Sequence, residues 1–234
     1  MKKLNKYMVS PEYQRIPHLN KEISNMTHDD IQLESPVAFP LDCFVQEKLD
    51  AANLGVSWLN DGPIVRNREH ILSKGYTKIR TPAKKQFTST WNWVHAHEDD
   101  IKEVEKTWQS PITIFGEWMY AEHSIFYDRL PDLFIAYDIW SVEDEKFLSP
   151  DLTQNLLDKT NIKYIRPDRM KFNNIDEVVR ESKRPSEYRN GVVEGIVIKT
   201  SSGYFTKSVF KVVNNLFVRR MDFNEELRKN KIIT

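Results

Sequence analysis

Five short apolar runs limit what this chain can fold into more than any other feature. They are rich in Val, Ile, Phe, Trp and Tyr, the residues that favour extended strands. The runs lie at residues 43–49, 112–120, 133–140, 192–199 and 209–213. Helix signals lie between and after them, at residues 98–108, 151–159, 175–182 and 224–231. Because helices and strands do not alternate one to one, we expect an α+β fold with antiparallel sheets rather than a doubly wound parallel sheet.

The composition is that of a soluble globular protein. Of 234 residues, 40% are hydrophobic and 29% are charged, which suits one large domain with at most a small appendage. No apolar stretch approaches the ~20 residues that cross a bilayer, and the N-terminus lacks the apolar core of a secretory signal. The single cysteine, Cys43, excludes an internal disulfide and fits a reducing cytoplasm. We therefore expect a cytoplasmic protein that does not associate with membranes.

Charge and motif content narrow the choice of ligand. The chain has 34 basic and 34 acidic residues, whereas a nucleic-acid binder usually has a basic excess. Residues 74–85 and 199–220 nevertheless contain lysines and arginines without an acid. These stretches suit contacts to backbone phosphates or are ordinary solvated charge. Since the sequence has neither G-x-G-x-x-G nor a P-loop motif, a bound nucleotide would lack a glycine-rich phosphate cradle.

The first chemically informative segment is V-Q-E-K-L-D-A-A-N, in which Lys48 stands between Glu47 and Asp50. A lysine is a covalent nucleophile only when neutral, and adjacent carboxylates would raise its pKa. In a strand Glu47 points to the opposite face from Lys48, whereas Asp50 shares its face. Asp50 therefore needs another role, either binding a cation or ordering the loop. Alone, the segment predicts no more than a salt bridge at a strand end.

Two later apolar runs each contain an acid. Glu117 follows Gly116, and burying its carboxylate would cost several kcal/mol, so it either contacts a ligand or points outward from an edge strand. Tyr137 precedes the acid Asp138. An aromatic face at this position suits stacking on a nucleobase or is simply part of the core.

The last two segments add lysines. In E-G-I-V-I-K, Glu194 and Lys199 are five residues apart, so strict alternation puts them on opposite faces of a strand unless Gly195 marks a bulge. Lys207 and Lys211 are four residues apart and would share a strand face.

Together these segments form the ordered series K-x-D-x-x-N, F-G-E, aromatic-Asp, E-G-x-V-x-K and a late lysine strand. That order resembles the covalent nucleotidyltransferase superfamily. Within it the chain looks most like the phage-like, RNA ligase 2-type family of ATP-dependent RNA ligases. Asn53, Glu47 before the lysine and Y-Q-R-I-P-H-L at residues 13–19 carry this likeness, which covers residues 13 to 217. The resemblance implies two mainly antiparallel β-sheets flanked by helices, with the ATP site between them.

The resemblance also implies a domain organisation and a reaction. Residues 1–36 would be a lead-in packed on the domain, and residues 37–234 a nucleotidyltransferase domain without a separate C-terminal OB-fold or nick-binding domain. Lys48 would attack ATP and hold AMP, which then passes to a 5′-phosphate end before a 3′-hydroxyl displaces it. Mg²⁺ or Mn²⁺ is expected to assist. The expected substrate is nicked or broken RNA, or an RNA/DNA hybrid, and the protein would act as a monomer in a bacterial or phage-infected cell.

Residue roles follow from the same resemblance. Lys48 is the expected nucleophile, Asp50 and Asp138 support the site, and Glu194 and Glu117 are expected near the metal. The expected nucleotide-binding residues are Glu47, Asn53, Arg66, Arg68, Glu117, Tyr137, Lys199, Lys207 and Lys211. Arg66 and Arg68 compete for one contact to the nucleotide.

The sequence departs from the family pattern at two positions, and three alternative functions remain. Ala51 replaces the usual glycine after the lysine, and Val209 replaces a basic residue for which Lys207 would compensate. A nick-sealing DNA ligase is hard to separate by sequence from an RNA ligase. Asn53 argues against a capping-type guanylyltransferase, and the complete set of motif residues argues against a non-catalytic nucleic-acid-binding domain.

Overall fold

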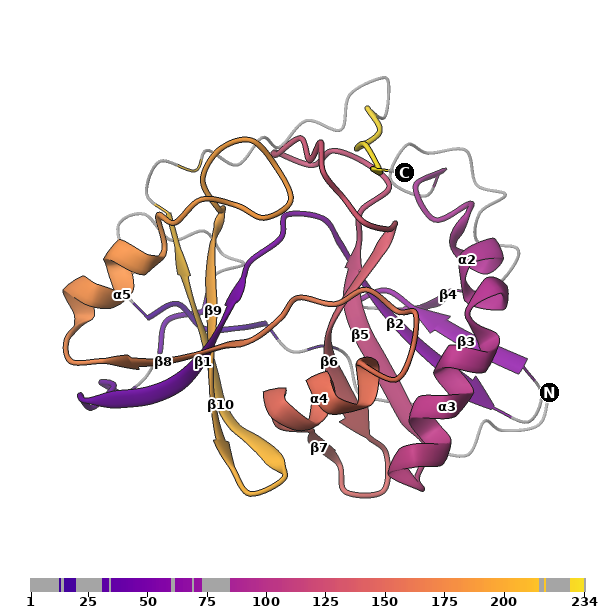
Figure 1. The fold of residues 1–234 in the computed structure, drawn as a ribbon, viewed down its shortest axis with the longest axis horizontal. Coiled ribbons are helices and arrows are strands. Elements are labelled where there is room, and N and C mark those ends of the chain that lie inside the picture. The colour runs from indigo at the N-terminus through magenta and orange to yellow at the C-terminus, as the bar shows by residue number, and fades with distance from the viewer. Residues whose placement is uncertain are drawn as a thin grey trace.

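The computed structural model describes residues 13, 15–19, 31–33, 35–59, 62–68, 70–72, 85–214, 217 and 228–233. Over these residues the chain forms two antiparallel β-sheets that lie side by side, with helices packed against them (Figure 1). The predicted α+β class with antiparallel sheets is therefore confirmed. No helix in the described ranges is long and apolar enough to cross a membrane.

The first sheet has four strands in the order β10-β9-β1-β8. They are β1 (Leu41–Glu47), β8 (Asp168–Phe172), β9 (Gly195–Ser202) and β10 (Phe205–Val213). The second sheet has six strands in the order β4-β3-β2-β5-β6-β7. They are β2 (Ala52–Leu59), β3 (Gly62–Arg66), β4 (Ile71–Leu72), β5 (Ile112–Trp118), β6 (Phe134–Ser141) and β7 (Lys146–Phe147).

The chain passes from the first sheet to the second through a single short loop. This loop, residues 48–51, joins the end of β1 to the start of β2 and begins with Lys48. Because β1 is paired on both sides and β2 lies inside the second sheet, the loop lies where the two sheets meet (Figure 1). This position puts Lys48 within reach of residues from both.

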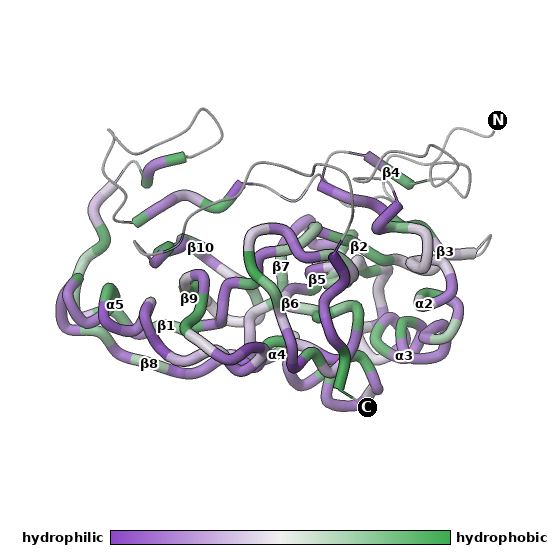
Figure 2. The backbone as a smooth tube through the Cα atoms, turned by 90° about the horizontal axis from the view of Figure 1, so that it is seen from above, coloured by the Kyte–Doolittle hydropathy of each residue, from purple (hydrophilic) through white to green (hydrophobic). Residues whose placement is uncertain are grey.

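Four described helices flank the sheets: α2 (Thr90–Ala96), α3 (Glu98–Trp108), α4 (Pro150–Leu157) and α5 (Ile175–Glu181). The helix predicted at 98–108 is confirmed, and three acids in its first turn favour its N-terminus. Ser149 caps α4 by accepting a hydrogen bond from the Leu152 amide, with Pro150 in the first turn. Seen from above (Figure 2), α3 and α4 lie on the same side of the second sheet.

One predicted helix is wrong in its described part. Residues 224–227 of the helix predicted at 224–231 lie outside the described residues, and residues 228–231 are not helical. Lys229 forms an antiparallel bridge with Ala121. The backbone there bonds to another segment of the chain instead of closing helical turns.

Three hydrophobic clusters fill the interior. The largest joins the second sheet to α2, α3 and α4 and includes Leu54, Ile114, Ile139, Ile101, Val104 and Leu157. A second supports the first sheet and α5 with Val45, Ile196, Phe210, Val212 and Val178. The third lies near the loop between the sheets and contains Leu49, Met119, Tyr127, Leu130, Ile135 and Tyr188. Each fully buried side chain of this kind contributes roughly 1.5–3 kcal/mol, and the third cluster fixes the walls around the loop.

The described part of the predicted lead-in contacts both sheets. The amide of Leu19 donates to the carbonyl of Lys211, and the amide of Lys211 donates to Pro17, which extends the first sheet at β10. The hydroxyl of Tyr13 donates to the carboxylate of Asp138 in β6 at 2.7 Å. Most of residues 1–36 lie outside the described residues, so the proposed boundary at residue 36 stays a prediction.

Candidate active site

Lys48 faces a buried carboxylate. Its Nζ atom lies 2.6 and 2.7 Å from the two side-chain oxygens of Glu194. The backbone reinforces the pair, because the Lys48 amide donates to the carbonyl of Gly195 at 3.0 Å. Glu194 is only 5% exposed. A lysine and an acid 146 residues apart in sequence are thus held together at the loop between the sheets.

The charge of Glu194 governs the state of Lys48. Burial alone would lower the pKa of Lys48, but the negative charge of Glu194 and its hydrogen bonds outweigh burial and raise that pKa above its usual value. Burial raises the pKa of Glu194, and the charge of Lys48 lowers it in part. In this state Lys48 is a protonated cation, so it becomes a nucleophile only when the influence of Glu194 is removed.

Gly195 explains how Glu194 reaches this position. A Cβ atom at Gly195 would lie 2.3 Å from the carbonyl oxygen of Val212 in β10, so only glycine permits the two strands to approach so closely. The register of β9 with β10 is regular at Gly195, so of the two possibilities left open by the sequence, a bulge at this glycine is not the one observed. Glu194 instead lies in a bend just before the strand, where the alternation of faces does not apply.

Glu117 and Asn53 form an adjacent polar pair on the second sheet. They are directly opposite each other on β5 and β2, and β5 lies between β2 and β6, so the edge-strand interpretation of Glu117 is wrong. Burial raises the pKa of Glu117 to about 8, against the opposing charges of Lys48 and Arg68. Glu117 Oε2 and Asn53 Oδ1 are buried without a hydrogen-bond partner among the described residues. Such atoms require a partner, and a bound ligand would supply one.

A β-bulge in β6 turns Tyr137 toward Asn53. Phe115 pairs with Asp138 and Gly116 pairs with Ala136, so Tyr137 is an extra residue in β6. Bulges of this kind redirect a side chain, and the Tyr137 hydroxyl accepts a hydrogen bond from Asn53 Nδ2 at 2.5 Å. Gly116 is needed here because an added Cβ atom would lie 2.4 Å from the carbonyl oxygen of Ile135. The glycine of F-G-E therefore permits the bulge that aims the tyrosine.

The two arginines after β2 have different surroundings. Arg66 is 5% exposed, and its guanidinium donates to the carbonyls of Asn67 and Arg68, which shapes the turn after β3. Arg68 is exposed, and its positive charge acts on Glu117 and lowers the pKa of that carboxyl. The structure thus places Arg68, of the two candidates, beside the pocket.

This order of motifs and their convergence around Lys48 agree with the comparison to known families. The family model described as RNA ligase matches residues 41–213. The chain belongs to the RNA ligase family. The resemblance expected from the sequence is confirmed, and all the site residues predicted from it lie inside the matched region.

Solved structures show the same fold. Three structures of Naegleria gruberi RNA ligase match with TM-scores of 0.56 (apo), 0.54 (with pyrophosphate) and 0.53 (with AMP and Mn), at 21%, 23% and 20% identity. Each match covers 75% of this chain and 50% of the other, so this chain spans about half the length of those ligases. A comparison with curated protein sequences gave no match.

In this member of the RNA ligase family, Lys199 has a different place from the predicted phosphate contact. Its Nζ atom donates to Gln46 Oε1 at 2.6 Å, to Asp138 Oδ1 at 2.6 Å and to the Tyr137 carbonyl at 3.1 Å. The side chain is 1% exposed. The three hydrogens of its ammonium are thus all directed at protein acceptors, and a contact from Lys199 to a phosphate stays a prediction. Lys199 instead joins β9 of the first sheet to β6 of the second.

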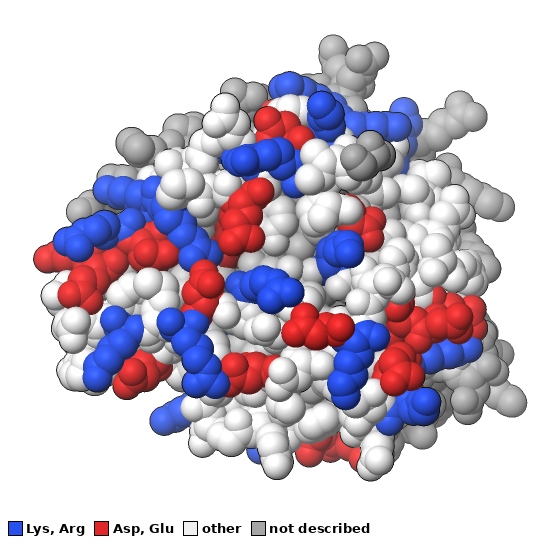
Figure 3. Space-filling model, viewed as in Figure 1, with Lys and Arg blue, Asp and Glu red and all other residues white. Residues whose placement is uncertain are grey.

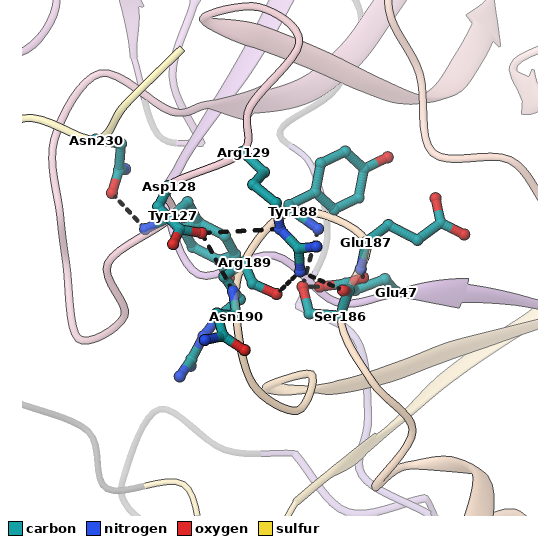
Figure 4. A network of polar contacts seen from close by, with 10 residues as sticks. All are labelled: Glu47, Tyr127, Asp128, Arg129, Ser186, Glu187, Tyr188, Arg189, Asn190 and Asn230. Carbon is teal, nitrogen blue, oxygen red and sulfur yellow. Dashed lines mark hydrogen bonds and ion pairs between the residues drawn. The ribbon is translucent and has the colours of Figure 1, made fainter. Parts of the chain in front are cut away.

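Glu47 is also held in a structural role. One carboxylate oxygen accepts from the hydroxyl of Ser186 at 2.5 Å and the other from the amide of Glu187 at 3.0 Å (Figure 4). Burial raises the pKa of Glu47, and these hydrogen bonds partly offset the rise. The side chain therefore supports the loop at residues 186–188, and the nucleotide contact predicted for it stays a prediction.

Asp50 fulfils one of the two roles that the sequence left open. Its Oδ2 atom accepts from the amide of Ser124 at 2.7 Å, and its own amide donates to the Tyr127 hydroxyl at 2.9 Å. These bonds order the loop that carries Lys48. Ala51 is not among the described residues with positive φ, so alanine replaces the usual glycine without backbone strain.

The two late lysines are separated by an irregularity in β10. The register with β9 shifts between Thr206 and Ser208, so Lys207 is the bulged residue and does not share a regular face with Lys211. Lys207 is exposed and lies near the hairpin end of β10, whereas Val213 at the other end pairs with Gly195. The positive charge of Lys211 lowers the pKa of Glu194. Lys211 therefore lies close enough to Glu194 to act on its charge, whereas the position of Lys207 lends no support to the predicted compensation for Val209.

The structure also shows residues that support the site and that the sequence did not indicate. Tyr127, Ser124, Ser186 and Gln46 hold the loop or the lysines. Each acts on a residue more than 70 positions away in the chain, so no local pattern could have revealed it.

Proposed function

We propose that this protein is an ATP-dependent RNA ligase that joins 3′-hydroxyl and 5′-phosphate ends through an AMP bound covalently to Lys48. The observation that carries the proposal is the position of Lys48, held against the buried carboxylate of Glu194 beside a pocket with unpartnered acceptors on Glu117 and Asn53. Membership of the RNA ligase family supports the reaction class. The related Naegleria gruberi ligase has been solved with AMP, ATP and pyrophosphate.

The chemistry begins with loss of a proton from Lys48. Its neutral Nζ then attacks the α-phosphorus of ATP, a phosphorus–nitrogen bond forms, and the bond to pyrophosphate breaks. A 5′-phosphate oxygen next displaces the lysine and takes the AMP. The 3′-hydroxyl finally attacks that 5′-phosphorus and releases AMP. Each step depends on positioning and on neutralising charge, which this pocket can provide with fixed groups.

The pocket offers a separate contact for each part of ATP. Tyr137 would stack on the adenine, since an aromatic face contributes about 1–3 kcal/mol to binding a base. Glu117 and Asn53 would bond the nucleoside through the acceptors that lack partners. Arg68 and Lys211 would contact the phosphates, because both carry positive charge that acts on acids of the site.

A divalent cation fits beside Glu194. This carboxylate has acidic Asp50 nearby, which raises its pKa, so the site favours added positive charge. The described residues contain no group of three or more His, Cys, Asp or Glu that could hold a metal by themselves, and Mg²⁺ commonly binds one or two carboxylates together with substrate phosphates. Bound Mg²⁺ or Mn²⁺ would supply positive charge near Lys48, and Mn is present in related solved structures.

We also propose the wider setting of the enzyme. Its partner would be nicked or broken RNA, or an RNA/DNA hybrid, bound by a monomer of residues 37–234 with the lead-in 1–36 packed on it. Figure 3 shows Lys and Arg interspersed with Asp and Glu on the face seen there, so that face offers no uniform basic patch. The basic stretch at 74–84 lies outside the described residues. The free, buried Cys43 is compatible with the cytoplasm of a bacterial or phage-infected cell.

One assay tests the reaction. The protein is incubated with α-labelled ATP or GTP and Mg²⁺, and an acid-labile protein adduct is sought. Wild type should be labelled by ATP, and Lys48→Ala should not, whereas Lys207→Ala should label normally as a matched control. Labelling by GTP alone would indicate a capping-type enzyme. No adduct at all would reject the ligase proposal.

A second assay tests the substrate. Nicked duplexes with RNA or DNA on each side of the nick are offered to the adenylated protein. Sealing of duplexes with RNA at the 3′-hydroxyl side is the expected result. If only all-DNA nicks are sealed, the protein is a DNA ligase instead.

A further inference from the structure

The loop that carries Lys48 is held from outside the pocket. The amide of Asp50 donates to the Tyr127 hydroxyl at 2.9 Å, and Asp50 Oδ2 accepts from the amide of Ser124 at 2.7 Å. Tyr127 is 1% exposed and belongs to the hydrophobic cluster around Leu49. The segment at 119–130 therefore determines the path of the chain immediately after Lys48.

Residues 228–233 cover this segment along its length. They run beside it without regular secondary structure and form isolated bridges at Lys229 and Ile232. Five backbone hydrogen bonds join the two segments. They run from Glu122 N to Arg228 O at 2.8 Å, Asn230 N to Tyr120 O at 3.3 Å, Lys231 N to Tyr127 O at 2.9 Å, Leu130 N to Lys231 O at 3.1 Å and Ile233 N to Leu130 O at 2.9 Å. The short segment thus acts as an added strand on a loop that is otherwise irregular.

Asn230 is the centre of this contact. Its Oδ1 atom accepts from the amide of Tyr127 at 2.9 Å (Figure 4), and its Nδ2 atom donates to the carbonyls of Met119 at 2.9 Å and Ala121 at 3.1 Å. One acceptor and two donor bonds fix the orientation of the amide. Because these partners lie at both ends of residues 119–127, the Asn230 side chain joins the two ends of this loop.

A second support holds the chain just before Lys48. Glu47 bonds Ser186 and Glu187, and Arg129 donates to the carbonyls of Ser186 and Arg189 (Figure 4). Arg129 follows Tyr127 in the chain by two residues. The residues that hold Glu47 and those that hold Asp50 are therefore connected by hydrogen bonds, and both groups depend on the loop that Asn230 closes.

We propose that Asn230 is a positioning residue for the Lys48 nucleophile, acting through Tyr127 and Asp50. The inference rests on the proposed adenylation at Lys48. Asn230 touches no pocket residue in the bonds described, so its loss should leave the binding of ATP by Glu117, Asn53 and Tyr137 intact. It should instead displace Lys48, and misplacement of a reacting group by about 1 Å can cost on the order of 100-fold in rate.

The experiment is a double-mutant cycle on single-turnover adenylation. Asn230→Ala removes the three side-chain hydrogen bonds of Asn230. Tyr127→Phe removes only the hydroxyl that holds Asp50 and keeps the buried ring. Each should lower the maximal rate about tenfold or more, with the half-saturating ATP concentration changed by less than about twofold. The double variant should be no slower than the slower single variant, because both act on one path. Asn161→Ala is the matched control, since Asn161 bonds Asp100 on α3, far from the loop in sequence, and should react as wild type does.

Three results would overturn the proposal. They are effects that multiply in the double variant, a raised ATP requirement with an unchanged maximal rate, and an equal loss of rate in Asn161→Ala. Hydrogen exchange separates this inference from the proposed function, because it needs no ATP. Faster exchange of amides 48–51 in Asn230→Ala than in Asn161→Ala supports positioning even if no adduct forms in wild type, and unchanged exchange rejects it.

Discussion

Lys199 and Asp138 form a buried ion pair, 2.6 Å between Nζ and Oδ1, that joins the two sheets. Asp138 also accepts a hydrogen bond from Tyr13 of the lead-in. Both charges are nearly inaccessible to water, at 1% and 3% exposure. Loss of one partner alone would therefore leave a buried charge without compensation and destabilise the fold.

We expect Lys199→Met to destabilise the protein by about 3–5 kcal/mol, because it leaves the Asp138 carboxylate buried without its cation. Adding Asp138→Asn should recover part of this loss by removing the uncompensated charge. Urea unfolding of the three variants measures both effects. Equal stability of the single and double variants would show that the charge of Asp138 is compensated elsewhere.

Glu194→Gln should lower the pKa of Lys48. The pKa is raised in the wild type because the charge of Glu194 outweighs burial, so burial alone would act once that charge is gone. At pH 8, without nucleotide or metal, an amine-specific reagent should modify Lys48 faster in the variant, by about tenfold for each pKa unit. Modification of exposed Lys207 is the internal control and should not change. Slower modification of Lys48 in the variant would contradict this electrostatic account.

Glu117→Gln should change how stability depends on pH. The pKa of Glu117 rises from 4.5 to about 8 on folding, mainly through burial, so the folded state holds a proton that the unfolded state has lost between these values. Stability of the wild type should therefore fall as pH rises from about 4.5 to 8, and level off above 8. The variant cannot ionise, so relative to wild type it should gain roughly 3–5 kcal/mol over this window. Unfolding curves at pH 4, 6 and 8.5 measure the trend, and parallel curves would refute it.

Gly116→Ala should weaken ATP binding as well as stability. Its Cβ atom would lie 2.4 Å from the Ile135 carbonyl oxygen, which forces the bulge at Tyr137 to move. Gly203→Ala is the control, because Gly203 has φ of +61° but nothing within 4 Å of an added Cβ atom. It should cost about 1 kcal/mol through backbone strain and leave ATP affinity unchanged. Similar ATP affinity for both variants would show that Tyr137 does not depend on the bulge.

The sequence predicted elements with strong local patterns and missed those without them. The predicted strands at 112–120 and 133–140 correspond to β5 (Ile112–Trp118) and β6 (Phe134–Ser141), because their apolar runs are long. Strand β2 (Ala52–Leu59) was not predicted, since Asn53, Gly55 and Ser57 interrupt its apolar residues. Strand β8 (Asp168–Phe172) has the sequence DRMKF and lies at a sheet edge, mostly toward solvent, so it carries little apolar signal.

The site residues likewise fall into those that the sequence predicted and those whose role it could not predict. The motif order identified Lys48, Glu117, Tyr137 and Glu194, and the structure brings them together. The roles of Lys199 and Glu47 could not be predicted, because their partners Asp138 and Ser186 are 61 and 139 residues away. The choice between Arg66 and Arg68 likewise depends on which side chain is buried in the tertiary structure.

The short loop between the sheets has a consequence for how activity is lost. Lys48 lies where the chain leaves one sheet for the other, and each sheet supplies part of the pocket. Neither sheet could hold its site residues in place for catalysis if the other sheet unfolded. Formation of the covalent adduct would therefore require both sheets, and in denaturant it should be lost no later than the unfolding of the less stable one.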